Sequence, residues 1–522
     1  MTALRPAEVV IGLDVGTTAV KAVAFGVGSA WRCSAVREYP LLQPRPGWQI
    51  QDADLVVAAT VEALRECVAV AGVPVAAVSV GTAMHGLLAL DDECRPITPL
   101  ITWADSRASS EASELRVTSV AVDLHQVTGT PVHPMSPLTK LRWAARHDPG
   151  TCRRARWWIG LKDYVLLCLT GTLMTELSSA SATGMLDLRA GDWYGPALEL
   201  AAVHRWQLPD VRPTTTVLGT TPETMSSTGL PTGTPVVAGA ADGPLGNLGT
   251  GAVAPGEAGL NLGTSGAVRM VVDRPLTDPD GRTFCYALTD ELWVVGGAIS
   301  NGAHVVRWAA DGLAPDVATT AGTSGSDEAL LGMAAEAPPG SDGLVMLPYL
   351  VAERAPLWDP QLPGAYLGLR RDHTRAHLIR AAVEGVALQL AAVVDLVDRL
   401  EPVTTVRATG GAFRAPLWRT VVAAALDRPV TFTSDAEGGA LGAAALGLFA
   451  LGRVERLVDA AALLTGPSAW EGATVVAPPE HVQVFQRLRE RLPGLANGVA
   501  AAAGALAGDR SGDLTAPAFT VS

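Results

Sequence analysis

Lysine is nearly absent from this chain, and so are several features that mark other classes of protein. Only Lys21, Lys140 and Lys162 stand among 39 basic residues, and the 522-residue chain has a formal net charge of −13. No basic run is longer than a few residues, which argues against a nucleic-acid partner or binding to an anionic membrane. Because arginine supplies almost all of the positive charge, each lysine is a position of interest.

Paired cysteines and targeting segments are also lacking. The six cysteines are widely spaced and form no CxxC pair, which disfavours a zinc site or a disulfide scaffold and favours a reduced, cytoplasmic enzyme. The first eight residues lack the charged segment and apolar run of a signal peptide, and the apolar stretch 499–507 is too short to span a bilayer. We therefore expect a cytoplasmic protein without a membrane partner.

The chain does contain enough apolar sequence for two cores. Hydrophobic residues make up 48% of it and charged residues 17%, and its length exceeds that of one ordinary domain. Helical periodicity at 53–71 is followed by a buried-strand pattern at 75–80, which is typical of α/β layers. Residues 214–234 are rich in Thr, Pro and Gly, and we expect a loop there, followed by a short strand at 235–238.

An internal repeat is the most informative pattern. Residues 12–18 read GLDVGTT and residues 259–265 read GLNLGTS, and a basic residue, Lys21 or Arg269, follows each copy. The first copy lies in a strand–turn–strand pattern over 9–25. So long a period predicts two domains that share one topology, not a solenoid. We place an N-terminal domain at 1–247, a C-terminal domain at 248–490 and a partly disordered tail at 491–522.

The repeated Gly/Thr turns suit phosphate. Backbone N–H groups of such a turn, together with Thr hydroxyls, bind phosphate oxygens. One turn alone is also compatible with an ordinary hairpin, but two facing turns can clamp one polyphosphate. Asp14 precedes the first turn and can hold Mg²⁺, whereas Asn261 of the second copy carries no charge. The candidate phosphate-binding residues are Gly16, Thr17, Thr18 and Lys21 in the first copy, and Gly263, Thr264 and Ser265 in the second.

Asp242 lies among small residues in the segment VVAGAADGPLGNLGTG, residues 236–251. A substrate hydroxyl can approach a carboxylate there closely enough to transfer its proton. The alternative is that the same residue, followed by Gly-Pro, is a helix N-cap. Gly410 and Gly411 pose a similar choice, because a Gly-Gly turn after a strand suits either close approach of a ligand or simple turn geometry.

A polar cluster in the first half has the composition of a polyol site. Met84 and His85 follow the predicted strand at 75–80, and Trp103, Asp105 and Arg107 come shortly after. Hydroxyls can bond to such an Asp/Arg pair while a sugar face packs on the Trp ring. The alternative is a surface ion pair beside a core Trp. Similarly, Lys162 can serve an anionic substrate or lie on a helix surface.

Taken together, these motifs resemble the FGGY carbohydrate kinases over nearly the whole chain. The shared stretches are GLDVGTTAVKAVAF, ITWADSRA, KDYVLLCLTG, ADGPLGNLG, LNLGTSGAVR and ATGGAFRAPLW. TAMHG at 82–86, GRTFCYAL at 281–288, NGAHVVRWAAD at 301–311 and PYLVAERAPLWDP at 348–360 are similar to the gluconate kinase branch. The resemblance implies an α/β fold of two ribonuclease-H/actin-like domains, with a catalytic cleft between them.

The resemblance also implies roles for individual residues. Asp242 matches the family's catalytic base, and ATP with Mg²⁺ would supply the phosphoryl group to D-gluconate. Arg107, His85 and Lys162 are candidates to meet a substrate carboxylate. On the nucleotide side the matches are Thr17, Thr18, Lys21, Thr264 and Gly411, with Gly302 near a further contact. On the sugar side they are Met84, His85, Trp103, Asp105 and Arg107.

The sequence is also compatible with other acceptors and other functions. The acceptor can be a ketopentose such as xylulose, or another polyol, instead of a sugar acid. The chain can also be a non-catalytic actin-like nucleotide-binding protein, or a sugar sensor without chemistry. We expect only a small-molecule sugar or sugar acid and ATP as partners, and a homodimer is a further open alternative.

Overall fold

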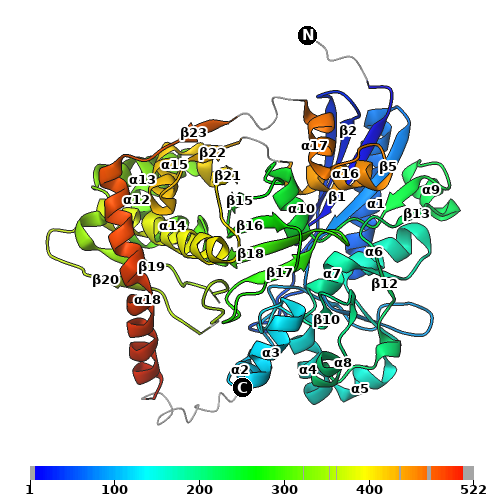
Figure 1. Ribbon diagram of the computed structural model, residues 1–522, viewed down its shortest axis with the longest axis horizontal. Coiled ribbons are helices and arrows are strands. Elements are labelled where there is room, and N and C mark those ends of the chain that lie inside the picture. Colours follow the sequence, from blue (N-terminus) through cyan, green and yellow to red (C-terminus); the bar gives the residue numbers. More distant parts are fainter. Residues whose placement is uncertain are drawn as a thin grey trace, which may run out of the picture.

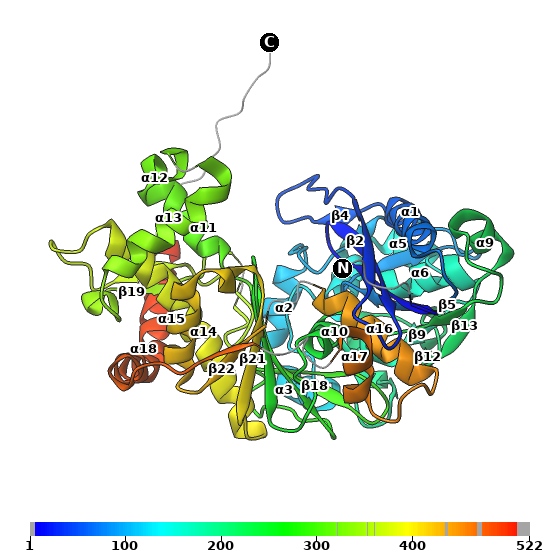
Figure 2. The same ribbon diagram turned by 90° about the horizontal axis from the view of Figure 1, so that it is seen from above.

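The computed structural model of the chain describes residues 6–320, 322–351, 353–359, 361–433, 437–466 and 472–508. These residues form two lobes, each built on its own mixed β-sheet with helices packed against it (Figures 1 and 2). Among the helices of these ranges, none is long and apolar enough to cross a membrane.

The N-terminal lobe centres on a six-stranded sheet in the order β13-β14-β5-β1-β2-β3. Strands β1 and β2 form an antiparallel hairpin, β5 runs parallel to β1, and β14 runs parallel to β5. The strands are β1 (Val9–Val15), β2 (Ala19–Gly26), β3 (Arg32–Glu38), β5 (Val75–Thr82), β13 (Val217–Gly219) and β14 (Pro235–Val237). The predicted hairpin and both predicted strands are confirmed.

The C-terminal lobe repeats this arrangement in a seven-stranded sheet, in the order β17-β18-β16-β15-β21-β22-β23. Here β15 and β16 form the hairpin, and β21 and β22 follow in parallel on the other side of β15. The strands are β15 (Glu257–Leu262), β16 (Gly266–Val272), β17 (Phe284–Ala287), β18 (Trp293–Ile299), β21 (Thr405–Thr409), β22 (Val430–Phe432) and β23 (Ala473–Val475). The shared strand order confirms the duplicated α/β topology predicted from the repeat.

Helices connect and cover both sheets. The first part of the chain contributes α1 (Ala53–Ala71), α2 (Ser109–Arg116), α3 (Ser119–Thr128), α4 (Pro137–His147), α5 (Pro149–Arg154), α6 (Leu161–Thr170), α7 (Leu177–Ser181), α8 (Gly195–Ala201), α9 (Pro222–Thr228) and α10 (Asp242–Gly249). The second part contributes α11 (His304–Leu313), α12 (Pro315–Thr320), α13 (Gly322–Glu336), α14 (Arg375–Leu400), α15 (Pro416–Leu426), α16 (Gly438–Ala450), α17 (Leu457–Thr465) and α18 (Pro479–Gly508).

Short strand pairs and 3₁₀ turns complete the chain. The pairs are β4 (Ile50–Gln51) with β7 (Leu100–Ile101), β6 (Leu88–Leu90) with β8 (Trp157–Ile159), β9 (Thr175–Glu176) with β12 (Val211–Arg212), β10 (Leu186–Asp187) with β11 (Asp192–Trp193), and β19 (Val345–Leu347) with β20 (Ala365–Leu367). The 3₁₀ turns are η1 (Arg205–Gln207), η2 (Ser341–Gly343) and η3 (Gly411–Arg414).

Helices α16 and α17 come late in the sequence, yet they pack on the N-terminal sheet beside β1 and β2 (Figures 1 and 2). Val10 and Phe25 of the sheet share one buried apolar cluster with Leu441 and Leu464 of these helices. The contact is close because position 12 is glycine: a Cβ atom at Gly12 would lie 1.9 Å from the carbonyl oxygen of Ala440. The C-terminal part of the sequence therefore completes the N-terminal core.

Two expectations differ from the structure. The loop predicted at 214–234 is wrong, because β13 and α9 lie within it, and Thr221 and Pro222 give α9 a regular start. Residues 491–508, which we assigned to the tail, form the second half of α18. There Leu492, Ala496 and Val499 follow helical spacing and are buried. The rest of the predicted tail, 509–522, lies outside the described residues.

Candidate active site

A cavity of about 250 Å³ is lined by residues from both lobes. Thr17 of the first Gly/Thr turn and Ser265 of the second both line it, so the fold brings the two copies of the repeat together. The N-terminal part of the chain contributes Thr17, Met84, His85, Trp103, Met135 and Asp242. The C-terminal part contributes polar residues that include Asn261, Ser265, Arg269, Tyr286 and Arg354.

Asp242 lines the cavity as the first residue of α10, and the N-cap of that helix is Ala241, so the alternative of an N-cap role for Asp242 is wrong. Its Oδ1 atom accepts hydrogen bonds from the backbone N–H of Met84 at 3.2 Å and of Gly243 at 2.9 Å. Burial raises the pKa of the Asp242 carboxyl, and the positive charge of Arg269 opposes that rise. The Asp242 carboxylate therefore lies at the cavity, and two backbone N–H groups hold its Oδ1 atom in place.

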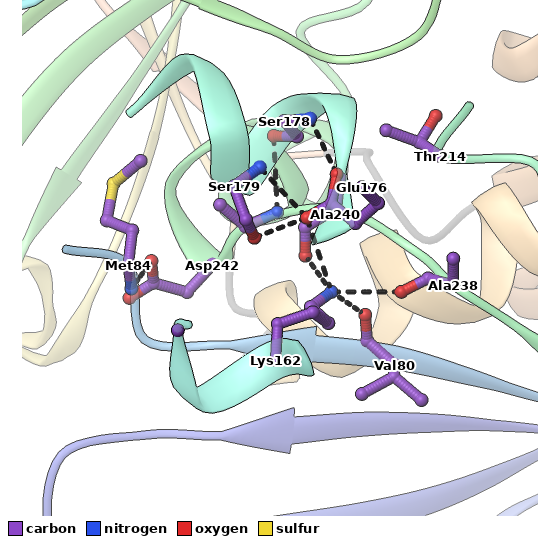
Figure 3. A network of polar contacts seen from close by, with 12 residues as sticks. Val80, Met84, Lys162, Glu176, Ser178, Ser179, Thr214, Ala238, Ala240 and Asp242 are labelled. Carbon is purple, nitrogen blue, oxygen red and sulfur yellow. Dashed lines mark hydrogen bonds and ion pairs between the residues drawn. The ribbon is translucent and has the colours of Figure 1, made fainter. Parts of the chain in front are cut away.

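Lys162 fixes the segment that leads to Asp242 (Figure 3). Its Nζ atom donates hydrogen bonds to the carbonyl oxygens of Val80, of Ala238 at 3.1 Å and of Ala240 at 2.8 Å. The side chain is 1% exposed, so the alternative of a helix-surface lysine is wrong. It points at the backbone beneath the cavity and is not one of the residues that line it.

Glu176 supports the same segment from the other side (Figure 3). One of its carboxylate oxygens lies 3.9 Å from Lys162 Nζ, and the carboxylate accepts the backbone N–H groups of Ser178 and Ser179. The Ser178 hydroxyl in turn accepts the N–H of Ala241 at 3.2 Å. The residues just before Asp242 are thus held through both their carbonyl and their amide groups.

His85 enters the cavity as a neutral side chain. Its backbone is left-handed, with φ 65°, and its Nδ1–H donates to the carbonyl oxygen of Ala182 at 2.8 Å. Burial lowers the pKa of His85 to about 3, and the charge of Lys140 adds to this effect. Lys140 donates hydrogen bonds of 2.7 Å to the carbonyl oxygens of His85 and Thr102, and therefore fixes the backbone behind the imidazole.

The predicted Trp/Asp/Arg cluster is only partly at the cavity. Trp103 lines it, and its Nε1–H donates to the Thr17 hydroxyl at 2.8 Å. Asp105 and Arg107 instead bond to each other, with N–O distances of 2.8 and 2.7 Å, and the guanidinium stacks 3.6 Å from the ring centroid of Trp48. This pair is buried, so it is not the surface ion pair of the alternative, and it does not line the cavity.

The first turn places acidic and basic groups close together. Asp14 and Lys21 face each other in the β1–β2 register, and Lys21 Nζ lies 2.5 Å from Glu437 Oε2. Burial raises the pKa of Asp14 to about 6, and the nearby Asp242 carboxylate adds to the rise. Two neighbouring carboxylates of this kind fit a divalent cation held partly through water. Within the described residues, no cluster of three or more His, Cys, Asp or Glu side chains is arranged to hold a metal.

A second cavity, of about 750 Å³, lies in the C-terminal lobe beside the second turn. Gly263 and Gly411 line it, and a Cβ atom at Gly411 would meet nothing within 4 Å. Gly410 and Gly302 are not among the lining residues. Gly410 has a φ of 126°, with Leu262 O 2.1 Å from its Cβ position, and Gly302 has Thr264 O 2.7 Å from its Cβ position. Gly410 and Gly302 therefore shape the backbone of the cavity, while Gly263 and Gly411 face its interior.

Three residues that line the cavity, Arg269, Tyr286 and Arg354, were not predicted to be part of the site. A signal was present for Arg269, since alternation in the strand after the second turn puts it on the same face as Ala267, and both line the cavity. Tyr286 and Arg354 lie in GRTFCYAL and PYLVAERAPLWDP, two stretches that carry the resemblance to gluconate kinases. Nothing in those stretches shows that they meet Asp242 across the lobes.

Comparison with known proteins agrees with this geometry. The family models of the FGGY carbohydrate kinases match residues 9–249 with their N-terminal domain and residues 258–451 with their C-terminal domain. Gluconokinase of Bacillus subtilis (strain 168) is 38% identical over 451 residues, which cover 85% of this chain and 88% of that protein. Xylulose kinase of Escherichia coli (strain K12) is 31% identical over 458 residues, with coverages of 86% and 91%.

A solved structure supports the same assignment. Gluconate kinase from Lactobacillus acidophilus superposes with a TM-score of 0.88 at 31% identity, over 96% of this chain and 99% of that one. The matches span both lobes, both Gly/Thr turns and the cavity between them. The chain therefore belongs to the FGGY family of carbohydrate kinases.

Proposed function

We propose that the protein is a gluconokinase, which transfers the γ-phosphoryl group of ATP to the 6-hydroxyl of D-gluconate. The observation that carries this proposal is one cavity that contains Asp242 together with residues of both Gly/Thr turns. The relatives named gluconokinase and gluconate kinase match nearly the whole chain, which supports gluconate as the acceptor.

The proposed reaction is an in-line transfer. Asp242 accepts the proton of the 6-hydroxyl while a bond forms between that oxygen and the γ-phosphorus. The bond from the γ-phosphorus to the bridging oxygen breaks, and ADP leaves with its negative charge. N–H and hydroxyl groups of the turns at 16–18 and 263–265 hold the phosphates. Positioning and charge stabilisation supply most of the rate in such reactions.

The two cavities divide the reactants between them. We place the acceptor in the 250 Å³ cavity beside Met84, His85 and Trp103, with Asp105 and Arg107 supporting its wall. We place the nucleoside of ATP in the 750 Å³ cavity beside Gly411. Mg²⁺ near Asp14 would neutralise phosphate charge when bound. The domain boundaries at 1–247 and 248–490, the cytoplasmic location and a homodimer stay predictions.

A substrate panel tests the proposal directly. ADP release is measured with D-gluconate, D-xylulose, D-glucitol and glycerol, and the phosphorylated carbon is identified by NMR. We expect gluconate to have the highest kcat/KM and to be phosphorylated at carbon 6. Highest activity on xylulose would favour the second candidate, for which the Escherichia coli relative provides the reason. ATP binding without any transfer would indicate a non-catalytic nucleotide-binding protein.

A further inference from the structure

Arg269 is half-buried, and its positive charge has no bonded counter-ion among the described residues. Its side chain lines the 250 Å³ cavity, and it makes no hydrogen bond or ion pair with any of the residues that the structure describes. Burial lowers the pKa of Arg269 to about 10, with the charge of Asp242 as the main opposing influence. A cation that is partly withdrawn from water is costly unless an anion pairs with it. The cavity is therefore prepared for an anionic ligand.

The other basic groups near the cavity are already engaged. Arg354 donates through Nε to the Ser300 hydroxyl at 3.1 Å and through Nη2 to the carbonyl oxygen of Ile299 at 2.9 Å. Arg107 is paired with Asp105, Lys162 with three carbonyl oxygens, and His85 is neutral. Arg269 thus differs from every candidate that the sequence suggested for a substrate carboxylate.

Tyr286 adds a second unsatisfied donor. The residue is 2% exposed, lines the same cavity, and its hydroxyl has no hydrogen-bond partner among the described residues. Arg269 and Tyr286 lie on β16 and β17, which both pair with β18. Leaving such buried donors unpaired is unfavourable in the absence of ligand. A carboxylate can accept from a guanidinium and a phenol together.

Position along the strand favours a substrate carboxylate over a nucleotide phosphate. Arg269 lies four residues beyond Ser265 of the second turn in β16, and strands rise about 3.3 Å per residue. Its backbone is therefore roughly 13 Å from the phosphate-binding turn. The large cavity beside Gly263 and Gly411 does not include Arg269 or Tyr286.

We propose that Arg269 and Tyr286 bind the carboxylate of the acceptor and thereby make the enzyme select sugar acids over neutral sugars. This inference rests on the proposed function, and it specifies which residues bind the carboxylate of the acceptor.

A matched pair of acceptors tests the assignment. D-glucitol has the configuration of gluconate at carbons 2 to 5, with a hydroxymethyl group in place of the carboxylate. For Arg269→Met we expect kcat/KM with gluconate to fall about 10- to 100-fold, as for a lost charge-assisted hydrogen bond, and kcat/KM with glucitol to change little. If glucitol is not turned over, its inhibition constant against gluconate is compared instead. Arg274→Met, at an exposed pair with Glu401, is the surface control and should change neither.

A milder variant guards against a folding defect. Tyr286→Phe removes only the hydroxyl and should lower kcat/KM several-fold for gluconate alone. Equal losses on both acceptors in Arg269→Met would overturn the proposal and assign this arginine to the phosphoryl group. An unchanged preference for gluconate in both variants would also overturn it. A wild-type enzyme that does not phosphorylate gluconate would instead refute the proposed function.

Discussion

The Nζ atom of Lys162 donates a hydrogen bond of 2.8 Å to the carbonyl oxygen of Ala240, two residues before Asp242. Lys162 does not line the cavity, yet it fixes the backbone that leads to Asp242, the proposed base. Lys140 stands in the same relation to His85, whose carbonyl oxygen it contacts at 2.7 Å. Two of the three lysines of this chain therefore position adjacent parts of one site, since Met84, next to His85, donates its backbone N–H to Asp242 Oδ1.

Lys162→Met should lower kcat about 10- to 100-fold, because a small displacement of the base weakens proton transfer. The KM values for gluconate and ATP should change much less, since their binding residues are untouched. Steady-state kinetics with both substrates varied checks this. Thermal unfolding shows whether the variant is folded, and a folded variant with normal kcat would contradict the positioning role.

Lys140→Met is the matched substitution. It removes the donor behind His85 and Thr102, so it should raise the KM for gluconate more than it lowers kcat. The same assay measures both constants. Equal changes in kcat and in the KM for gluconate in the two lysine variants would contradict separate roles, in which Lys162 positions the base and Lys140 positions the acceptor.

Asp242→Asn should reduce turnover about 10²- to 10⁴-fold, as expected when a general base is removed. An amide oxygen can still accept the N–H of Met84, so α10 and the nucleotide cavity should be retained. Binding of ADP by calorimetry should match that of the wild type. Turnover close to wild type would remove Asp242 from the reaction.

Substitution of the adjacent glycines Gly410 and Gly411 should have different effects, on protein stability for Gly410 and on ATP binding for Gly411. Gly410→Ala forces a side chain onto a φ of 126° and into the carbonyl oxygen of Leu262, which should cost about 2 kcal/mol or more of stability. Gly411→Val adds bulk toward open space and should raise the KM for ATP roughly tenfold, with little loss of stability. Melting temperatures and ATP titrations separate the two effects.

The buried carboxyl of Asp163 predicts a pH dependence of stability. Burial raises its pKa from 3.8 to about 7, while its Oδ2 accepts the N–H of Gly160 at 2.8 Å. Because the folded protein binds this proton more tightly than the unfolded chain, folding takes up a proton between pH 4 and 7. The contribution of Asp163 to stability therefore falls as pH rises through that window, by up to about 1.4 kcal/mol per pH unit.

Asp163→Asn removes this titration and keeps an acceptor for Gly160. The melting temperature of the wild type should decline relative to the variant between pH 4.5 and 7.5. Parallel curves for the two proteins over that range would show that the carboxyl is ionised in both states.

The sequence alone predicted the duplicated hairpins, because a turn and its flanking strands are local features. It also identified Asp242 and both Gly/Thr turns as candidate site residues. It did not predict the burial of Lys162, since lysine is ordinarily exposed and its three carbonyl partners come from two distant segments. Arg269 was visible only as a basic residue after a turn, because its lack of a partner is a property of the folded cavity.

The packing of α16 and α17 on β1 and β2 also bears on how the chain is made. Val10 and Phe25 are synthesised long before Leu441 and Leu464, which cover them. Until then the nascent N-terminal lobe exposes an apolar face on the ribosome. The N-terminal core is therefore complete only after α16 and α17 have been synthesised, and a fragment ending after α10 would leave that face open to chaperones and to aggregation.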